Sequence, residues 1–205
     1  IYDFDGVICD SVNIKTEAFL ELFKHRGIDI QSKIKQYHLS NGGVSRFEKI
    51  KYIEEIFLGN KISSFDLTIK ANQFSEIVKE KVIKSNYILG ALEFITKKSK
   101  EAKQYICTGT PEDEIIEIME KRSIKNFFDE VFGSPMSKFE ILDNLILKNN
   151  FNKSDCLFFG DALTDLEASL KCQIPFCGIL NKNTNFPEEV FTITNFVDNR
   201  LKKLF

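Results

Sequence analysis

Short apolar runs alternate with amphipathic segments from about residue 87 onward, and this alternation limits the possible folds most strongly. The apolar runs are QYICTG, FDEVFGS, CLFFGD and IPFCGIL. The segments between them, which begin after Pro111, Ser137 and Ala162, have the periodicity of helices. Continuous apolar strands joined by helices are typical of a parallel sheet covered on both faces. We therefore predict an α/β fold with a Rossmann-like core formed by residues 86–205, to which residues 1–10 add a first strand.

Residues 11–85 follow a different pattern, which is helical throughout. Apolar residues between positions 14 and 23 fall on one helical face, and similar stripes occupy residues 47–57 and 65–82. No stretch rich in Gly, Ser or Pro separates this region from the rest of the chain. We predict that residues 11–85 form a small helical unit inserted between the first strand and the remainder of the core.

The composition excludes several classes of protein. The chain has 205 residues, which suffices for one large domain or for a domain with a modest insertion. Charged residues make up 28% and the net charge is -2, so nothing favours a nucleic-acid or membrane partner. The five cysteines form no CxxC pair, no apolar run approaches the roughly 18 residues of a membrane span, and no signal peptide is visible. We expect a cytoplasmic protein with reduced cysteines.

Polar residues follow the predicted strands, at the edge of the sheet where open parallel sheets bind ligands. They are Asp3, Asp5, Thr108, Gly109, Lys138, Asp161 and Asp165. Two carboxylates 4 Å apart repel by roughly 4 kcal/mol at an effective dielectric constant of 20, so four converging acids require a cation. Because the ligands on offer are oxygens, without a suitably placed His or Cys, the sequence favours Mg²⁺ over zinc or copper.

Each of these features alone also has a purely structural interpretation. Asp5 with Gly6 is compatible with a turn, Asp161 with a helix N-cap, and Lys138 with a solvated surface. Thr110 and Asp113 have the spacing of a capping box, with Pro111 at the first helical position. The joint order of DxD, Thr-Gly, Lys and GDxxxD favours a catalytic site, because each motif falls on the same side of the predicted sheet.

In this order the motifs resemble those of the haloacid dehalogenase superfamily, in its magnesium-dependent phosphatase branch. DFDGVICD, ICTGT, Lys138 and GDALTD are similar to its four motifs, and the order of elements agrees over nearly the whole chain. The resemblance implies that residues 11–85 form an α-helical cap. It also implies that Asp3 is the nucleophile, that Asp5 is the general acid and base, and that Asp161 is a metal ligand. Thr108 and Lys138 would then hold the phosphate.

The chemistry of these residue types agrees with the roles that the resemblance implies. A carboxylate such as Asp3 can attack phosphorus and form an aspartyl-phosphate, while Asp5 first gives a proton to the leaving group and then takes one from water. Thr108, the backbone near Gly109 and Lys138 would hold the phosphate oxygens. We expect Mg²⁺ to be bound by Asp3, Asp161 and, by the resemblance, the backbone carbonyl of Asp5. Asp165 is expected to lie behind these ligands.

Two phosphoryl-transfer activities remain open at this point. A phosphatase acting on a small phosphorylated metabolite is the prediction, and a sugar-phosphate mutase of the β-phosphoglucomutase kind is the alternative. The segment GGVSR, which ends at Arg46, resembles the substrate-contacting loop of those mutases, so Arg46 is a candidate substrate contact. Against the mutase, Lys15 stands where that family carries a His. A phospho-acceptor signalling domain has a different motif order and no such helical insert, and the oligomeric state is left open.

Overall fold

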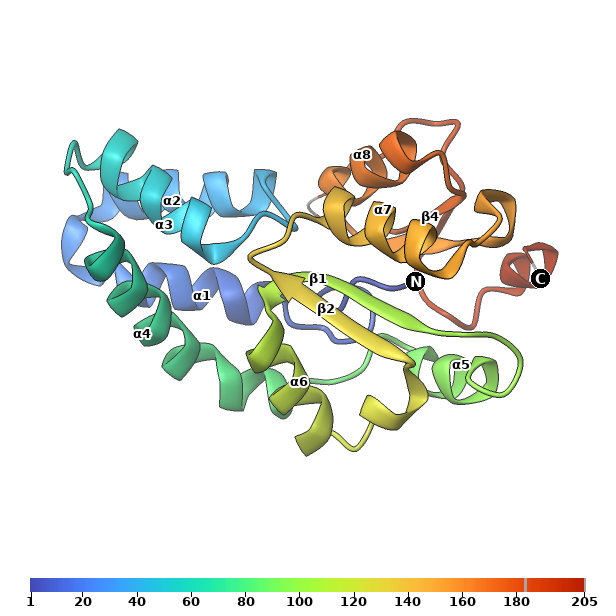
Figure 1. The fold of residues 1–205 in the computed structure, drawn as a ribbon. Coiled ribbons are helices and arrows are strands. Elements are labelled where there is room, and N and C mark those ends of the chain that lie inside the picture. The colour runs from blue at the N-terminus through green and yellow to red at the C-terminus, as the bar shows by residue number, and fades with distance from the viewer. Residues whose placement is uncertain (183, 205) are drawn as a thin grey trace.

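The computed structural model describes residues 1–182 and 184–204 and has a central parallel sheet (Figure 1). Its strands are β1 (Tyr105–Pro111), β2 (Glu130–Ser134), β3 (Phe158–Gly160), β4 (Phe176–Ile179) and β5 (Thr192–Ile193). β1 pairs with β2, β3 with β4, and β4 with β5, all in parallel. Tyr2 joins the two halves through isolated bridges to Ile106 and Phe159. The predicted parallel core is confirmed, although the first residues contribute bridges rather than a full strand.

Helices cover both faces of this sheet. On one face lie α7 (Lys138–Asn149) and α8 (Leu163–Cys172), and on the other lie α5 (Ala91–Lys98) and α6 (Glu112–Lys121) (Figure 1). Successive side chains of a strand point to opposite faces. Ile106 therefore packs in the apolar cluster that includes residues of α5 and α6, whereas Cys107 packs in the cluster with α7 and α8. Burial on both faces is the reason why these strands are continuous apolar runs in the sequence.

The inserted helices form a cap beside the carboxyl edge of the sheet, at the left in Figure 1. The cap consists of α1 (Val12–Leu22), α2 (Ile28–Ser40), α3 (Arg46–Tyr52) with a following π-helical turn (Ile53–Phe57), and α4 (Ser64–Ile83). Phe19, Ile34 and Phe74 are buried among these helices. All four helices lie within residues 11–85, and the exact domain boundaries at residues 10 and 85 stay a prediction.

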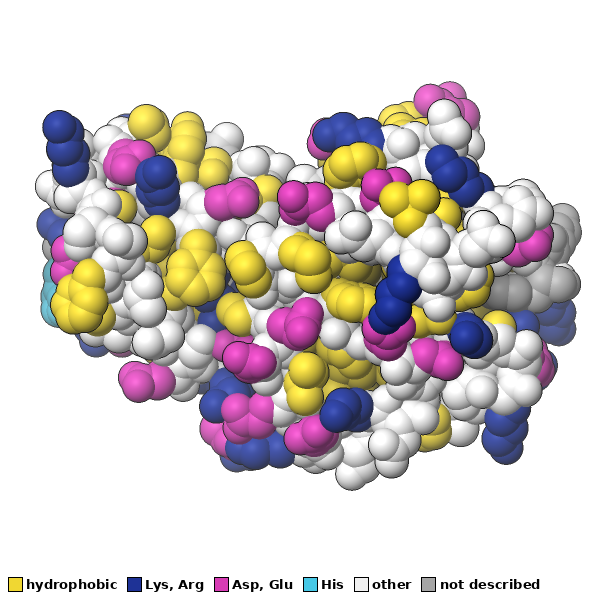
Figure 2. Space-filling view, in the orientation of Figure 1, with side chains coloured by type: hydrophobic (Ala, Val, Ile, Leu, Met, Phe, Trp, Pro, Cys, Tyr) yellow, Lys and Arg dark blue, Asp and Glu magenta, His cyan; other side chains and the backbone are white. Residues whose placement is uncertain are grey.

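The remaining regular structure is short. Single 3-10 turns occupy Lys24–Arg26, Lys125–Phe127, Lys153–Asp155 and Asn199–Lys203. Within residues 1–182 and 184–204, no helix is both long and apolar enough to cross a lipid bilayer. Figure 2 shows Lys and Arg side chains interspersed with Asp and Glu on the face toward the viewer.

Three local features differ from the sequence-based expectation. Helix α5 and strand β5 were not predicted, because elements of eight and two residues carry little periodic signal. The predicted capping box of Thr110 and Asp113 is wrong: α6 begins after Pro111 without a side-chain cap. The hydroxyl of Thr110 instead donates a hydrogen bond to Oδ2 of Asp5, 3.1 Å away. A residue that looked like a helix cap therefore belongs to the candidate site.

Candidate active site

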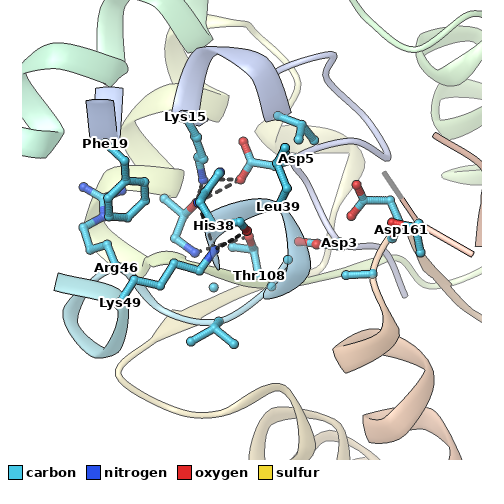
Figure 3. Close-up of a pocket in the computed structure, with 18 of the residues that line it drawn as sticks. Asp3, Asp5, Lys15, Phe19, His38, Leu39, Arg46, Lys49, Thr108 and Asp161 are labelled. Atoms are coloured by element: carbon cyan, nitrogen blue, oxygen red, sulfur yellow. Dashed lines mark hydrogen bonds and ion pairs between the residues drawn. The ribbon is translucent and has the colours of Figure 1, made fainter. Parts of the chain in front are cut away.

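A pocket lies between the carboxyl edge of the sheet and the cap (Figure 3). Asp3, Asp5, Thr108, Gly109 and Asp161 line it from the core. The empty volume of the pocket, including its opening to solvent, is about 700 Å³. The structure thus brings together, from three distant parts of the chain, the residues that the motifs singled out.

Three carboxylates gather at the floor of this pocket, where Asp3 and Asp161 line it, and directly behind it, where Asp165 is buried. One oxygen each of Asp3, Asp161 and Asp165 lies within 4.8 Å of the others, and all three residues are buried. Burial, together with the charges of Asp3 and Asp165, raises the pKa of Asp161 well above its usual value. Burial also raises the pKa of Asp165 to about 6, with a further rise from Asp3, although Lys138 acts in the opposite direction. A cation with a preference for oxygen ligands would relieve both effects.

Lys138 holds two of these carboxylates. Ser137 and Glu140 form a capping box that fixes the start of α7, so Lys138 occupies the first turn of that helix. Its Nζ donates to Oδ2 of Asp3 at 2.6 Å and also to Oδ1 of Asp165. Burial would lower the pKa of Lys138, but the charges of Asp165 and Asp3 raise it above the usual value, so the side chain is an ammonium.

The carboxylate of Asp3 is fixed at both oxygens. Oδ2 accepts from Lys138, and Oδ1 accepts from the backbone N-H of Phe4 at 2.6 Å. Asp3 itself is 3% exposed, and its residual exposure faces the pocket. A carboxylate that is oriented by two donors and opens onto a pocket is well placed for attack on a bound electrophile.

Asp5 lies on the same pocket but has a separate set of partners. Oδ1 accepts from the hydroxyl of Ser11 at 2.6 Å, and Oδ2 accepts from Lys15 and Thr110. Lys15 also donates to Oγ1 of Thr110 at 2.7 Å. Burial acts to raise the pKa of Asp5, but the charge and hydrogen bond of Lys15, with the two hydroxyls, lower it overall. Asp5 is therefore a carboxylate in the free protein, ready to accept a proton.

At two places around the site the backbone comes so close to neighbouring atoms that only glycine fits. Gly6 has a φ of +76°, and a Cβ at this position would lie 2.1 Å from Oδ2 of Asp161. A Cβ at Gly109 would lie 2.5 Å from the carbonyl oxygen of Gly43, which belongs to the cap. The hydroxyl of Thr164 donates to the carbonyl oxygen of Gly42 at 2.6 Å. The loop between α2 and α3 therefore rests directly on the core beside the pocket.

Arg46 lines the pocket from the first position of α3, but its guanidinium is engaged within the protein. It forms a bidentate ion pair with Glu114 of α6 and donates to Ser75 of α4. It also lies over the ring of Phe74, with Cζ 4.8 Å from the ring centroid. The predicted contact of Arg46 with a substrate stays a prediction.

The sequence-based reasoning did not single out several residues of the pocket. Asn181 donates to Oδ2 of Asp161 at 3.0 Å, and Thr184 donates to the carbonyl oxygen of Asp161 at 2.7 Å. Asn181 closely follows a strand, so the rule that found the other motifs could also have found it. His38 and Lys49 line the cap side of the pocket, and no motif marked them, because they come from separate helices, α2 and α3, whose side chains meet only in the folded cap.

A Rossmann-like sheet whose carboxyl edge carries the DxD, Thr, Lys and GDxxxD residues beneath a helical cap defines a class of capped hydrolases. Residues 1–179 match the family model of the haloacid dehalogenase-like hydrolases. The chain therefore belongs to this family, as the resemblance of its motifs predicts.

Individual relatives agree with this assignment. A phosphorylated carbohydrates phosphatase of Thermotoga maritima is 26% identical over 178 residues, which cover 82% of this chain and 78% of the relative. The fold is similar to that of a β-phosphoglucomutase from Clostridium difficile, with a TM-score of 0.76, 21% identity, and coverage of 95% and 89% of the two chains. It is also similar to a putative haloacid dehalogenase hydrolase of Bacillus subtilis solved with bound magnesium, with a TM-score of 0.70, 18% identity, and coverage of 98% and 96%.

Proposed function

We propose that this protein is a magnesium-dependent phosphatase that hydrolyses a small phosphomonoester through an aspartyl-phosphate on Asp3. The observation that carries the proposal is the environment of Asp3: its carboxylate is oriented by Lys138 and the Phe4 N-H, opens onto the pocket, and has a second acid, Asp5, on the same wall. The named activity of the Thermotoga maritima relative supports a phosphorylated carbohydrate as the substrate.

The residues at the floor of the pocket fit a magnesium ion. Asp3, Asp161 and the backbone carbonyl of Asp5 would hold it, with Asp165 behind them against Lys138. The donors are all oxygens, and burial, followed by the charges of the neighbouring carboxylates, raises the pKa values of Asp161 and Asp165. When bound, the ion would neutralise these charges and allow an anionic phosphate to approach an anionic nucleophile.

The protein's own residues then account for both displacements. A carboxylate oxygen of Asp3 attacks phosphorus and the bond to the leaving oxygen breaks. Asp5, a carboxylate in the free protein, takes up a proton from solvent in the substrate complex and gives it to that oxygen. Asp5 then takes a proton from a water molecule that attacks the aspartyl-phosphate, which releases inorganic phosphate and restores Asp3. Thr108 and the backbone near Gly109, which line the pocket, and Lys138, which contacts Asp3, would hold the phosphate oxygens during both steps.

A mutase is the second candidate, because the cap retains the GGVSR segment and closes on the core through it. A mutase must keep water from the aspartyl-phosphate until a second sugar hydroxyl arrives. We favour hydrolysis because Lys15, rather than His, contacts Asp5. The deciding assay supplies β-glucose 1-phosphate with a trace of the bisphosphate. Glucose 6-phosphate accumulating faster than inorganic phosphate would establish the mutase.

The phosphatase proposal is tested with purified protein, Mg²⁺ and p-nitrophenyl phosphate, followed by a panel of phosphorylated metabolites. We expect phosphate release in Mg²⁺ and none in EDTA. Equal rates under the two conditions would refute the role of the metal, and the absence of phosphate release from every ester would refute the phosphatase.

A further inference from the structure

Lys49 is a buried lysine on the cap side of the pocket that the proposed chemistry does not use. It lies on α3, is 3% exposed, and its side chain extends toward the middle of the pocket (Figure 3). Its Nζ lies 3.1 Å from Nδ1 of His38 and 3.4 Å from the carbonyl oxygen of His38. The ring of Phe19 lies beside it, with its centroid 5.9 Å from Nζ.

The charge of Lys49 lacks the partner that the other cations of the site have. Lys15 pairs with Asp5, Arg46 with Glu114, and Lys138 with Asp3 and Asp165. In the described part of the chain, no carboxylate forms an ion pair with Lys49. Because a buried charge without a counter-charge is costly, its presence in a binding pocket indicates that the counter-charge comes from a ligand.

His38 is suited to orient this ammonium. Burial, with the charges of Lys49 and Lys15, lowers the pKa of His38 to about 2, so its ring is neutral and Nδ1 can accept a hydrogen bond. An ammonium has three N-H donors, and His38 supplies two acceptors. The remaining donor is available to a group in the pocket.

The position of Lys49 determines which part of a substrate it meets. The core wall of the pocket carries Asp3, Thr108 and Asp161, where the phosphate would lie, and Lys49 belongs to the cap wall. Apolar side chains, among them Val12 and Leu39, also line this pocket. A substrate whose phosphate reaches Asp3 therefore presents its leaving group to Lys49.

We propose that Lys49, positioned by His38, is the cap-side recognition site for a second anionic group, a carboxylate or a second phosphate, on the leaving-group part of the phosphomonoester. This inference rests on the proposed phosphatase function and narrows its substrates to small phosphorylated compounds with two anionic groups. Lys49 acts on substrate affinity and takes no part in the displacement at phosphorus.

The test compares kcat/KM for paired esters that differ in the second group. The pairs 6-phosphogluconate with glucitol 6-phosphate, and 3-phosphoglycerate with glycerol 3-phosphate, exchange a carboxylate for a hydroxymethyl group. Fructose 1,6-bisphosphate with fructose 6-phosphate tests a second phosphate. We expect the wild type to prefer the doubly anionic member of at least one pair by about tenfold or more, chiefly through KM, as a hydrogen bond to a charged group would give.

Two variants isolate the contribution of Lys49. Lys49→Met keeps the length of the side chain without its charge, and we expect the preference within the pair to fall to about one. Lys51→Met, which removes an exposed lysine from the same helix, should leave the preference unchanged. Comparing two esters within each variant removes any effect of the substitution on folding or on the amount of active protein.

Each outcome bears on the inference. If p-nitrophenyl phosphate is hydrolysed but no pair shows a preference, the inference is wrong and the phosphatase function stands. If the preference survives in Lys49→Met, another residue binds the second anion and the inference is wrong. If no ester is hydrolysed at all, the proposed function fails and the inference fails with it.

Discussion

Arg46 of the cap and Glu114 of the core form a bidentate ion pair in which the two side chains are 4% and 8% exposed. Ser75 of α4 joins this pair through hydrogen bonds to both residues. The contact therefore ties α3 and α4 to α6, next to the pocket. An ion pair that is largely removed from water resists partial opening, since either partner left alone would be a buried, uncompensated charge.

Glu114→Gln should destabilise the protein by about 3–5 kcal/mol, because it leaves the guanidinium of Arg46 buried without a counter-charge. Urea titration of the variant and the wild type measures this difference in the free energy of unfolding. The matched control is Glu117→Gln on the same helix, α6, which removes the ion pair of Glu117 with Lys79 of α4 and its pair with Lys121 of α6. Both pairs are partly exposed, the one with Lys79 at 40% and 33%, so we expect a cost below about 1 kcal/mol. Equal costs for the two substitutions would contradict a special role of the Arg46 pair.

Arg46→Ala separates this structural role from the predicted contact with the substrate. If the guanidinium also binds substrate, Arg46→Ala raises KM for the true substrate more than Glu114→Gln does, with little change for p-nitrophenyl phosphate. Equal KM values in the two variants would restrict Arg46 to joining the cap and the core.

Asp3→Asn should abolish turnover while the protein stays folded. The amide is nearly isosteric with the carboxylate but cannot attack phosphorus, and the substitution removes one charge from a cluster of three acids. We therefore expect a melting temperature in EDTA that is equal to or above that of the wild type. Phosphate release above a few per cent of the wild-type kcat would exclude Asp3 as the nucleophile.

Asp5→Asn should leave the aspartyl-phosphate in place long enough to detect it. An activated ester such as p-nitrophenyl phosphate has a leaving group that needs no proton, so Asp3 can still be phosphorylated, whereas the attacking water has lost its base. Mass spectrometry of the intact protein after rapid mixing with the ester and Mg²⁺ should show the added phosphoryl group. The wild type serves as the control, and an unmodified variant would assign the base to another residue.

Magnesium should raise the melting temperature, since the proposed site is an acidic cluster that forms only in the folded state. At one hundred times its dissociation constant, the ion would stabilise the protein by about 2.7 kcal/mol. Asp161→Ala should remove most of this stabilisation and of the activity, whereas Asp165→Ala should remove less, because Asp165 is held by Lys138. Calcium-free buffers with and without Mg²⁺ provide the comparison, and an identical response in Asp161→Ala and the wild type would exclude Asp161 as a ligand.

The sequence predicts the core of this protein better than the cap side of its pocket, for a physical reason. Strand ends in a parallel sheet converge by topology, so Asp3, Thr108 and Asp161 could be placed together from their positions after apolar runs. The partners of Lys49 and Arg46 depend on how one cap helix packs against others, which periodicity does not specify. Asp5 illustrates both cases. Its position at the carboxyl edge of the sheet was predictable from the sequence, but its ion pair with Lys15 of the cap was not.

Lys49 gives a prediction for the dependence of stability on pH. Burial, with the charges of Lys15 and Lys138, lowers the pKa of Lys49 from 10.5 to about 7 in the folded protein, although Asp161 and Asp5 act in the opposite direction. Between pH 7 and pH 10.5 the unfolded chain therefore binds a proton at this site that the folded protein does not bind. The contribution of Lys49 to stability must then rise with pH across this window, and its full destabilising effect is present below pH 7.

The measurement is the difference in free energy of unfolding between Lys49→Met and the wild type, taken by urea titration in EDTA at several pH values. Groups that titrate equally in both proteins cancel in this difference. We expect Lys49→Met to be the more stable protein at pH 6.5, and its advantage to shrink toward pH 10 by about 4 kcal/mol, most of what the pKa change allows. A difference that stays constant from pH 6.5 to pH 10 would mean that Lys49 keeps an ordinary pKa, and its ammonium would then have a counter-charge within the protein.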